Sequence, residues 1–86
     1  VEIKVLDGLS SQPITDAEIF YNFIDSPRTY DTYFDRTDGS GEGFGEIAQG
    51  EYLFTVRKSG YSSLNKNLSA RPGETHNLVF RIYPSN

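Results

Sequence analysis

Hydrophobic and polar residues alternate along most of this chain with the two-residue period of β-strands. The clearest segment is 51–58, where Tyr52, Phe54 and Val56 share one face and mostly polar residues share the other. We expect the hydrophobic faces of several such segments to form one core. The predicted inward-facing rows are Ile3 and Val5, then Ala17, Ile19, Tyr21 and Phe23, then Tyr52, Phe54 and Val56, and finally Leu78, Phe80 and Ile82.

Seven segments have this strand-like pattern, and clusters of glycine, proline, aspartate and serine separate them. No segment of helical length repeats its hydrophobic residues at intervals of three and four. The pattern therefore predicts an all-β fold, a seven-stranded antiparallel Greek-key β-sandwich of immunoglobulin-like type. The predicted strands are 1–6, 17–24, 30–35, 43–47, 51–58, 61–68 and 75–83.

Local sequence features add detail to this arrangement. Residues 38–41 read Asp-Gly-Ser-Gly, a composition that supplies the positive φ angles of tight turns, so we expect a hairpin between the third and fourth strands. Tyr33 and Phe34 are adjacent, which breaks the alternation of the third strand. The polar sixth segment is best placed at a sheet edge.

Composition supports a single small domain that spans residues 1–86. Aromatic residues make up 14% of the chain, so six Tyr and six Phe supply much of the core. The absence of cysteine excludes disulfides and thiolate metal sites. We expect neither a leader nor a membrane span within this sequence, and we interpret it as one domain of a larger multidomain protein.

The charge of the chain argues against two classes of partner. The formal net charge is −4, and the twelve acidic residues are spread over the whole sequence. Nucleic-acid binding requires a basic stripe that neutralises phosphates, and an anionic membrane surface repels a chain of this charge. We therefore expect no nucleic-acid partner and no membrane insertion.

Five short motifs carry a resemblance to a known family. They are a first strand that ends at Asp7, Pro13-Ile14 followed by Ala17 and Ile19, Thr37-Asp38 followed by Gly41 and Phe44, Gly50 followed by Tyr52, Phe54 and Val56, and Gly60-Tyr61. In order and spacing they resemble the carboxypeptidase regulatory-like domain, a family with a transthyretin-like (prealbumin-like) β-sandwich. The resemblance covers essentially the whole chain.

That resemblance implies a function as well as a fold. It implies a non-catalytic spacer or stabilising accessory module of a secreted or cell-surface protein, in contact with neighbouring domains of the same chain. The expected location is extracellular or at the cell surface. No peptidase activity is implied, because the family's name describes where one member sits.

A more distant similarity is to surface domains of the collagen-adhesin B type. Those domains join a first-strand lysine to a last-strand asparagine or aspartate, assisted by a buried glutamate. Lys4 and Asn77 match the first two positions, but the strand expected to carry the glutamate reads Val56-Arg57-Lys58. We therefore expect no isopeptide bond, and an intact mass without loss of ammonia would exclude it.

The loop around residue 38 is a candidate calcium site. Asp35, Asp38, Ser40 and Glu42 place three acids and a hydroxyl close together, and calcium takes six to eight oxygen ligands. The two aspartates are three residues apart, which does not match the alternating spacing of calcium-binding loops, and a tight turn needs no metal. We expect no cofactor, with calcium at this loop as the alternative.

Exposed aromatic residues are the alternative to a purely structural function. Tyr21, Tyr30 and Tyr33 lie in a segment dense in rings, and sugars stack on exposed rings. The competing interpretation assigns most of these rings to the core. The alternative function is thus a carbohydrate- or protein-binding module, whose partner is a glycan or a surface protein.

His76 is the single histidine and the weakest of the candidates. Acid–base catalysis pairs histidine with a carboxylate and a nucleophile, but the serine and aspartate residues sit in turns and none can be placed beside His76. A structural position at the start of the last strand is the favoured interpretation. We expect that the protein is not an enzyme, and a small hydrolase is the third hypothesis.

Overall fold

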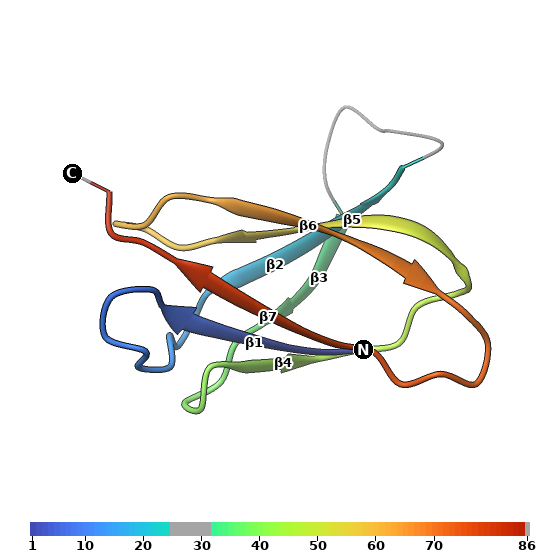
Figure 1. Cartoon of the computed structure of the whole chain (residues 1–86), viewed down its shortest axis with the longest axis horizontal. Coiled ribbons are helices and arrows are strands. Elements are labelled where there is room, and N and C mark those ends of the chain that lie inside the picture. Colours follow the sequence, from blue (N-terminus) through green and yellow to red (C-terminus); the bar gives the residue numbers. More distant parts are fainter. Residues whose placement is uncertain (25–31, 86) are drawn as a thin grey trace.

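The computed structural model describes residues 1–24 and 32–85, and these form seven strands in two packed sheets (Figure 1). The strands are β1 (Glu2–Asp7), β2 (Glu18–Phe23), β3 (Thr32–Arg36), β4 (Glu42–Phe44), β5 (Gly50–Arg57), β6 (Leu64–Ala70) and β7 (Asn77–Ile82). One sheet has the order β4-β1-β7, and the other has the order β3-β2-β5-β6. The prediction of an all-β, two-sheet sandwich with seven strands is confirmed.

The prediction that every pair is antiparallel is wrong. β1 pairs antiparallel with β4, but it pairs parallel with β7 over six consecutive residues, from Glu2 opposite Asn77 to Asp7 opposite Ile82. The prediction rested on the alternation of hydrophobic and polar residues. That alternation determines which face of a sheet each residue takes, but it does not determine the direction in which neighbouring strands run. The three-stranded sheet is therefore mixed. Within it, β1 and β7 run in the same direction (Figure 1).

The four-stranded sheet is antiparallel throughout. β5 lies between β2 and β6, with Tyr21 opposite Phe54 on one side and Tyr52 opposite Leu68 on the other. β6 lies at the edge of this sheet, as its polar sequence predicts. Lys66, on the inner side of β6, donates its Nζ to the Val79 carbonyl oxygen at 2.6 Å and so bridges the two sheets.

β3 contains a β-bulge at its two adjacent aromatic residues. Ile19 of β2 is opposite Asp35, but Phe20 is opposite Tyr33, so that Phe34 is the additional residue. Phe34 packs against the core, and Tyr33 lies on the outer face beside Phe20. Consecutive strand residues face opposite sides of a sheet, and the bulge shifts the pairing so that Asp35, not Phe34, lies opposite Ile19.

Residues 38–41 do not form the predicted hairpin. β3 and β4 belong to different sheets, so this turn carries the chain from one sheet to the other. Gly41 lies at φ +74°, and its carbonyl oxygen accepts the Val5 N–H at 2.8 Å, which leads the chain into its pairing with β1. β4, which is three residues long, follows this contact directly and pairs with β1.

The core forms between the sheets from the predicted inward rows, except that Tyr21, Phe23 and Leu78 are not fully buried. Phe23 is 37% exposed because it ends β2, where its ring contacts Tyr52 at 4.8 Å between centroids instead of lying beneath the other sheet. Leu78 is only partly buried. The buried hydrophobic residues are Ile3, Val5, Ile14, Ala17, Ile19, Tyr52, Phe54, Val56, Leu68, Ala70, Phe80 and Ile82.

Thr37 joins two segments that are far apart in the sequence. Its side chain is buried, its hydroxyl donates to the Ile14 carbonyl oxygen at 2.6 Å, and it accepts the Ala17 N–H at 2.9 Å. The backbone groups of Thr37 also bond Asp16 and Ala17. The loop before β2 is therefore held against the end of β3.

Candidate functional site

The tyrosines predicted as a binding surface do not share a face. Tyr21 points into the sandwich, where its ring lies 5.9 Å from that of Phe54 and 5.5 Å from that of Tyr52. Tyr33 lies on the outer face of the four-stranded sheet and is 54% exposed. Tyr30 lies outside the described residues. Tyr21 thus packs with the core, whereas Tyr33 faces solvent.

Phe20, Tyr33 and Arg57 form what we call the outer-face cluster. The rings of Phe20 and Tyr33 meet edge to face, with centroids 6.1 Å apart and planes at 78°. The Arg57 guanidinium lies 4.8 Å from the centroid of the Phe20 ring, a cation–π distance. β2, β3 and β5 each contribute one member, so the cluster is held by the sheet and not by a loop.

The chemistry of this cluster suits a ligand with both apolar and hydroxyl surfaces. An exposed tyrosine offers a ring face and a hydroxyl group, and a guanidinium supplies several donors. Asn65 and Asn67 follow on the same outer face of β6, since they alternate with inward-facing Leu64 and Leu68. The outer face therefore combines rings, a cation and amide groups over adjacent strands.

The acidic loop uses its carboxylates to bind backbone. Asp35 Oδ2 accepts the Phe44 N–H at 2.8 Å, and Asp38 Oδ1 accepts the N–H groups of Ser40 at 2.9 Å and Glu42 at 3.0 Å. Across residues 1–24 and 32–85, no three His, Cys, Asp or Glu side chains are grouped so as to hold a metal ion. Of the calcium candidates, Asp35 and Asp38 thus use carboxylate oxygens to bond backbone where the chain crosses between the sheets.

Glu42 lies beside another carboxyl group instead. A hydrogen bond between the side chains of Glu42 and Glu2 raises the pKa of Glu42, and burial and the negative charge of Glu2 raise it further. Glu2 lies on β1 and Glu42 on the neighbouring β4. Glu42 is opposite Lys4, which is two residues after Glu2, so the two glutamates are diagonal neighbours. Glu42 therefore binds a proton at a higher pH than an isolated glutamate does.

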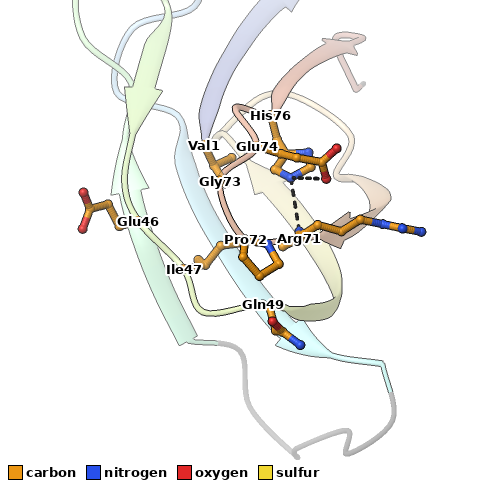
Figure 2. Close-up of a pocket in the computed structure, with 10 residues that line it drawn as sticks. Val1, Glu46, Ile47, Gln49, Arg71, Pro72, Gly73, Glu74 and His76 are labelled. Carbon is orange, nitrogen blue, oxygen red and sulfur yellow. Dashed lines mark hydrogen bonds and ion pairs between the residues drawn. The ribbon is translucent and has the colours of Figure 1, made fainter.

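A pocket of about 330 Å³ opens beside the start of β7 and contains the single histidine (Figure 2). His76 Nε2 accepts the Arg71 N–H at 3.4 Å and lies 3.8 Å from Glu74 Oε1. Both contacts join His76 to the turn that precedes β7. The pocket is lined by Val1, Glu46, Ile47, Gln49, Ala70, Arg71, Pro72, Gly73, Glu74 and His76.

Asp7 and Tyr61 connect the two sheets at the far end of β1. The Tyr61 hydroxyl donates to Asp7 Oδ2 at 2.7 Å, and the N–H groups of Leu9 and Ser10 donate to Asp7 Oδ1 at 2.8 and 3.0 Å. These hydrogen bonds lower the pKa of Asp7, and the bond from the Tyr61 hydroxyl has the largest effect. The hydrogen bond between Tyr61 and Asp7 also raises the pKa of Tyr61. The contact fixes the loop after β1 to the β5–β6 turn.

Sequence reasoning missed both the outer-face cluster and the Asp7–Tyr61 bond. Strand parity placed Phe20 and Arg57 on the outer side, but only the cross-strand register brings them together. Asp7 and Tyr61 are 54 residues apart in the chain. Parity is readable from the sequence, whereas register and long-range pairing are not.

Comparisons with known proteins add no family assignment. No protein-family model matches the chain, and no curated protein matches it significantly. The resemblance to the carboxypeptidase regulatory-like domain therefore stays a prediction. In the described part of the chain, no helix has the length and hydrophobicity needed to cross a membrane.

Proposed function

We propose that this chain is a non-catalytic spacer module of a secreted or cell-surface protein, which holds its neighbours a fixed distance apart. The observation that carries the proposal is the parallel pairing of β1 with β7. Because the first and last strands run in the same direction, the chain enters at one end of the sheet and leaves at the other (Figure 1). Domains attached before β1 and after β7 are then arranged in series.

The path of the chain after β7 supports a fixed exit direction. The Ser62 N–H donates to the Tyr83 carbonyl oxygen and the Ser85 N–H donates to the Gly60 carbonyl oxygen, both at 2.9 Å. Pro84 forms a bridge with Tyr61 in the same region. The exit segment is thus bonded to the opposite sheet, and a spacer needs this kind of stiffness.

We infer a transthyretin-like Greek-key topology of the carboxypeptidase regulatory-like type, in a module that contacts neighbouring domains of its own chain. Its support is that two of the family-like motifs meet physically, since the Thr37 hydroxyl bonds backbone groups of Ile14 and Ala17. Such contacts give motif residues a scaffold function, as expected of an accessory domain without catalysis.

Small-angle scattering of two copies joined in tandem by a short linker tests the spacer function. The domain measures 35 × 28 × 16 Å, and in-series attachment predicts that the second copy extends the particle by about the 35 Å length. A single copy serves as the control. Tandem particles that are no longer than one copy, because the domains fold back side by side, would reject the spacer proposal.

Glycan binding by the outer-face cluster is the second candidate. The observation in its favour is the exposed Tyr33 ring, which meets the Phe20 ring edge to face beside the Arg57 guanidinium. Stacking on such rings contributes binding energy without requiring a deep cavity. The acidic net charge favours neutral sugars over sulfated ones.

Titration of the domain with a panel of neutral oligosaccharides, followed by amide chemical shifts, tests this candidate. Binding predicts shifts concentrated around Tyr33 and their loss in Tyr33→Ser. Phe44→Ser is the matched control, because Phe44 is equally exposed but lies on the other sheet. No shifts near Tyr33 with any member of the panel would eliminate glycan binding at this face.

A further inference from the structure

We propose that the parallel ladder between β1 and β7 bears mechanical tension when the domain is pulled through its neighbours. The proposal rests on the proposed in-series function and identifies the β1–β7 pair as the part of the domain that resists the tension. The two strands that connect the domain to what precedes and follows it are direct neighbours. Force that enters at β1 therefore reaches β7 without first passing through the other five strands.

The direction of the strands determines how that force acts. β1 is pulled from its first residue and β7 from its last, and in a parallel pair these lie at opposite ends of the ladder (Figure 1). Ladder hydrogen bonds run across the strands, so tension along the strands loads all of them at once in shear. In an antiparallel pair, the same tension opens the bonds one after another from one end.

Hydrogen bonds at both ends define the length of this ladder. The Glu2 N–H donates to the His76 carbonyl oxygen and the Gly8 N–H donates to the Ile82 carbonyl oxygen, both at 2.8 Å. Between them lie six residue pairs in continuous register. At about 3.3 Å per residue the ladder is on the order of 20 Å long.

The core opposes sliding of the same two strands. Ile3 and Val5 of β1 are 0% exposed, and Phe80 and Ile82 of β7 are 0% and 1% exposed. Any slip between β1 and β7 pulls these side chains out of their packed positions at the moment the ladder bonds break. Hydrogen bonds and side-chain packing therefore resist the load together.

The bonds beyond the ladder yield first. Only two backbone bonds tie residues 83–85 to residues 60–62, and each is loaded almost alone. Their loss releases a few residues and leaves the ladder intact. We expect a small early extension followed by one main unfolding event.

Single-molecule pulling of the same domain in two directions tests the proposal. Since the chain has no cysteine, unique handles are available through Glu2→Cys with Ser85→Cys, and through Glu2→Cys with Thr75→Cys. The first pair loads the ladder in shear. The second peels β7 from β1, because Thr75 lies just before Asn77, which is opposite Glu2.

We expect a severalfold higher unfolding force for the shear pair than for the peeling pair, although both report the same folded domain. Forced unfolding follows the barrier and not the equilibrium stability, so differences in stability do not produce this contrast. Equal forces in the two directions would overturn the proposal. That result leaves the tandem scattering prediction intact. Failure of the tension-bearing proposal can therefore be distinguished from failure of the spacer proposal.

A matched pair of proline variants locates the resistance within the ladder. Glu2 and Gly8 donate to β7 whereas Val5 donates to Gly41, so the even-numbered Lys4 directs its N–H towards β7. Lys4→Pro removes a ladder bond, but Val79→Pro changes a residue of β7 whose N–H faces the open edge. We expect a larger loss of shear force for Lys4→Pro, and the reverse order would contradict the assignment.

Discussion

The Thr37 hydroxyl satisfies two backbone groups that are far from it in the sequence. It is one of two buried polar side chains in residues 1–24 and 32–85, and it both donates to Ile14 and accepts from Ala17. Sequence reasoning assigned Thr37 only to a turn motif. Its central position depends on a contact across 20 residues or more, which local pattern does not encode.

Thr37→Val tests this contact with little change in shape. It leaves a buried carbonyl and a buried N–H without their partner, so we expect a loss of about 1–3 kcal/mol in the free energy of unfolding. Thr15→Val is the matched control, because the Thr15 hydroxyl donates to Asp38 at 2.6 Å but is exposed. Its expected effect is within about 0.5 kcal/mol. Equal losses in urea denaturation would show that burial of Thr37 has no energetic consequence.

The Asp7–Tyr61 bond makes stability depend on pH in a known direction. The pKa of Asp7 is lowered in the folded state, first by the Tyr61 hydroxyl. The ionised Asp7 carboxylate therefore makes its full contribution to the free energy of unfolding at pH values above the pKa of the unfolded chain. That contribution is lost as the pH falls through the lower pKa of the folded state. Protonation of this one carboxylate weakens the connection between the loop after β1 and the β5–β6 turn.

Tyr61→Phe should raise the pKa of Asp7 towards its ordinary value, because the largest lowering contact is removed. The destabilisation should be greatest at neutral pH and should shrink as the solution is acidified below both pKa values. Carboxyl NMR titration of Asp7 and denaturation at several pH values measure the two effects. Tyr83→Phe is the control for loss of a tyrosine hydroxyl. An unchanged pKa of Asp7 in Tyr61→Phe would contradict the assigned cause.

At the scale of elements, strand positions were predictable and the connections between them were not. The alternation located all seven strands, although β4 ends at Phe44 instead of residue 47. The Asp-Gly-Ser-Gly turn has the composition of a hairpin, yet it joins different sheets. Turn composition specifies local backbone angles, and partner choice is decided by long-range pairing with β1.

Gly41→Ala tests the crossing between sheets. A Cβ at Gly41 would lie 2.7 Å from the Val5 carbonyl oxygen and 2.8 Å from the Pro13 Cβ, at φ +74°. Gly73 has nearly the same φ, +76°, but nothing lies within 4 Å of its Cβ position. Gly73→Ala therefore reports backbone strain alone, about 1–2 kcal/mol. We expect Gly41→Ala to lose clearly more in thermal or urea denaturation, and equal losses would show that the crossing tolerates a side chain.

At the scale of the whole molecule, the spacer proposal and the tension-bearing proposal depend on the direction of one strand. The sequence correctly predicted which residues of β1 and β7 face the core, since Ile3, Val5, Phe80 and Ile82 are buried. The same alternation fits a parallel or an antiparallel neighbour equally well. Candidate site residues were predicted less well, because Tyr21 and Tyr33 lie on opposite faces and the outer-face cluster depends on cross-strand register.

Distances between paired spin labels test the parallel arrangement most directly. Labels at Glu2→Cys and Ser85→Cys should give a narrow distribution beyond the roughly 20 Å length of the ladder. Labels at Glu2→Cys and Thr75→Cys should lie much closer together, since Glu2 is opposite Asn77. A short distance between positions 2 and 85 together with a long one between 2 and 75 would contradict the parallel pairing, and with it both the spacer and the tension-bearing proposals.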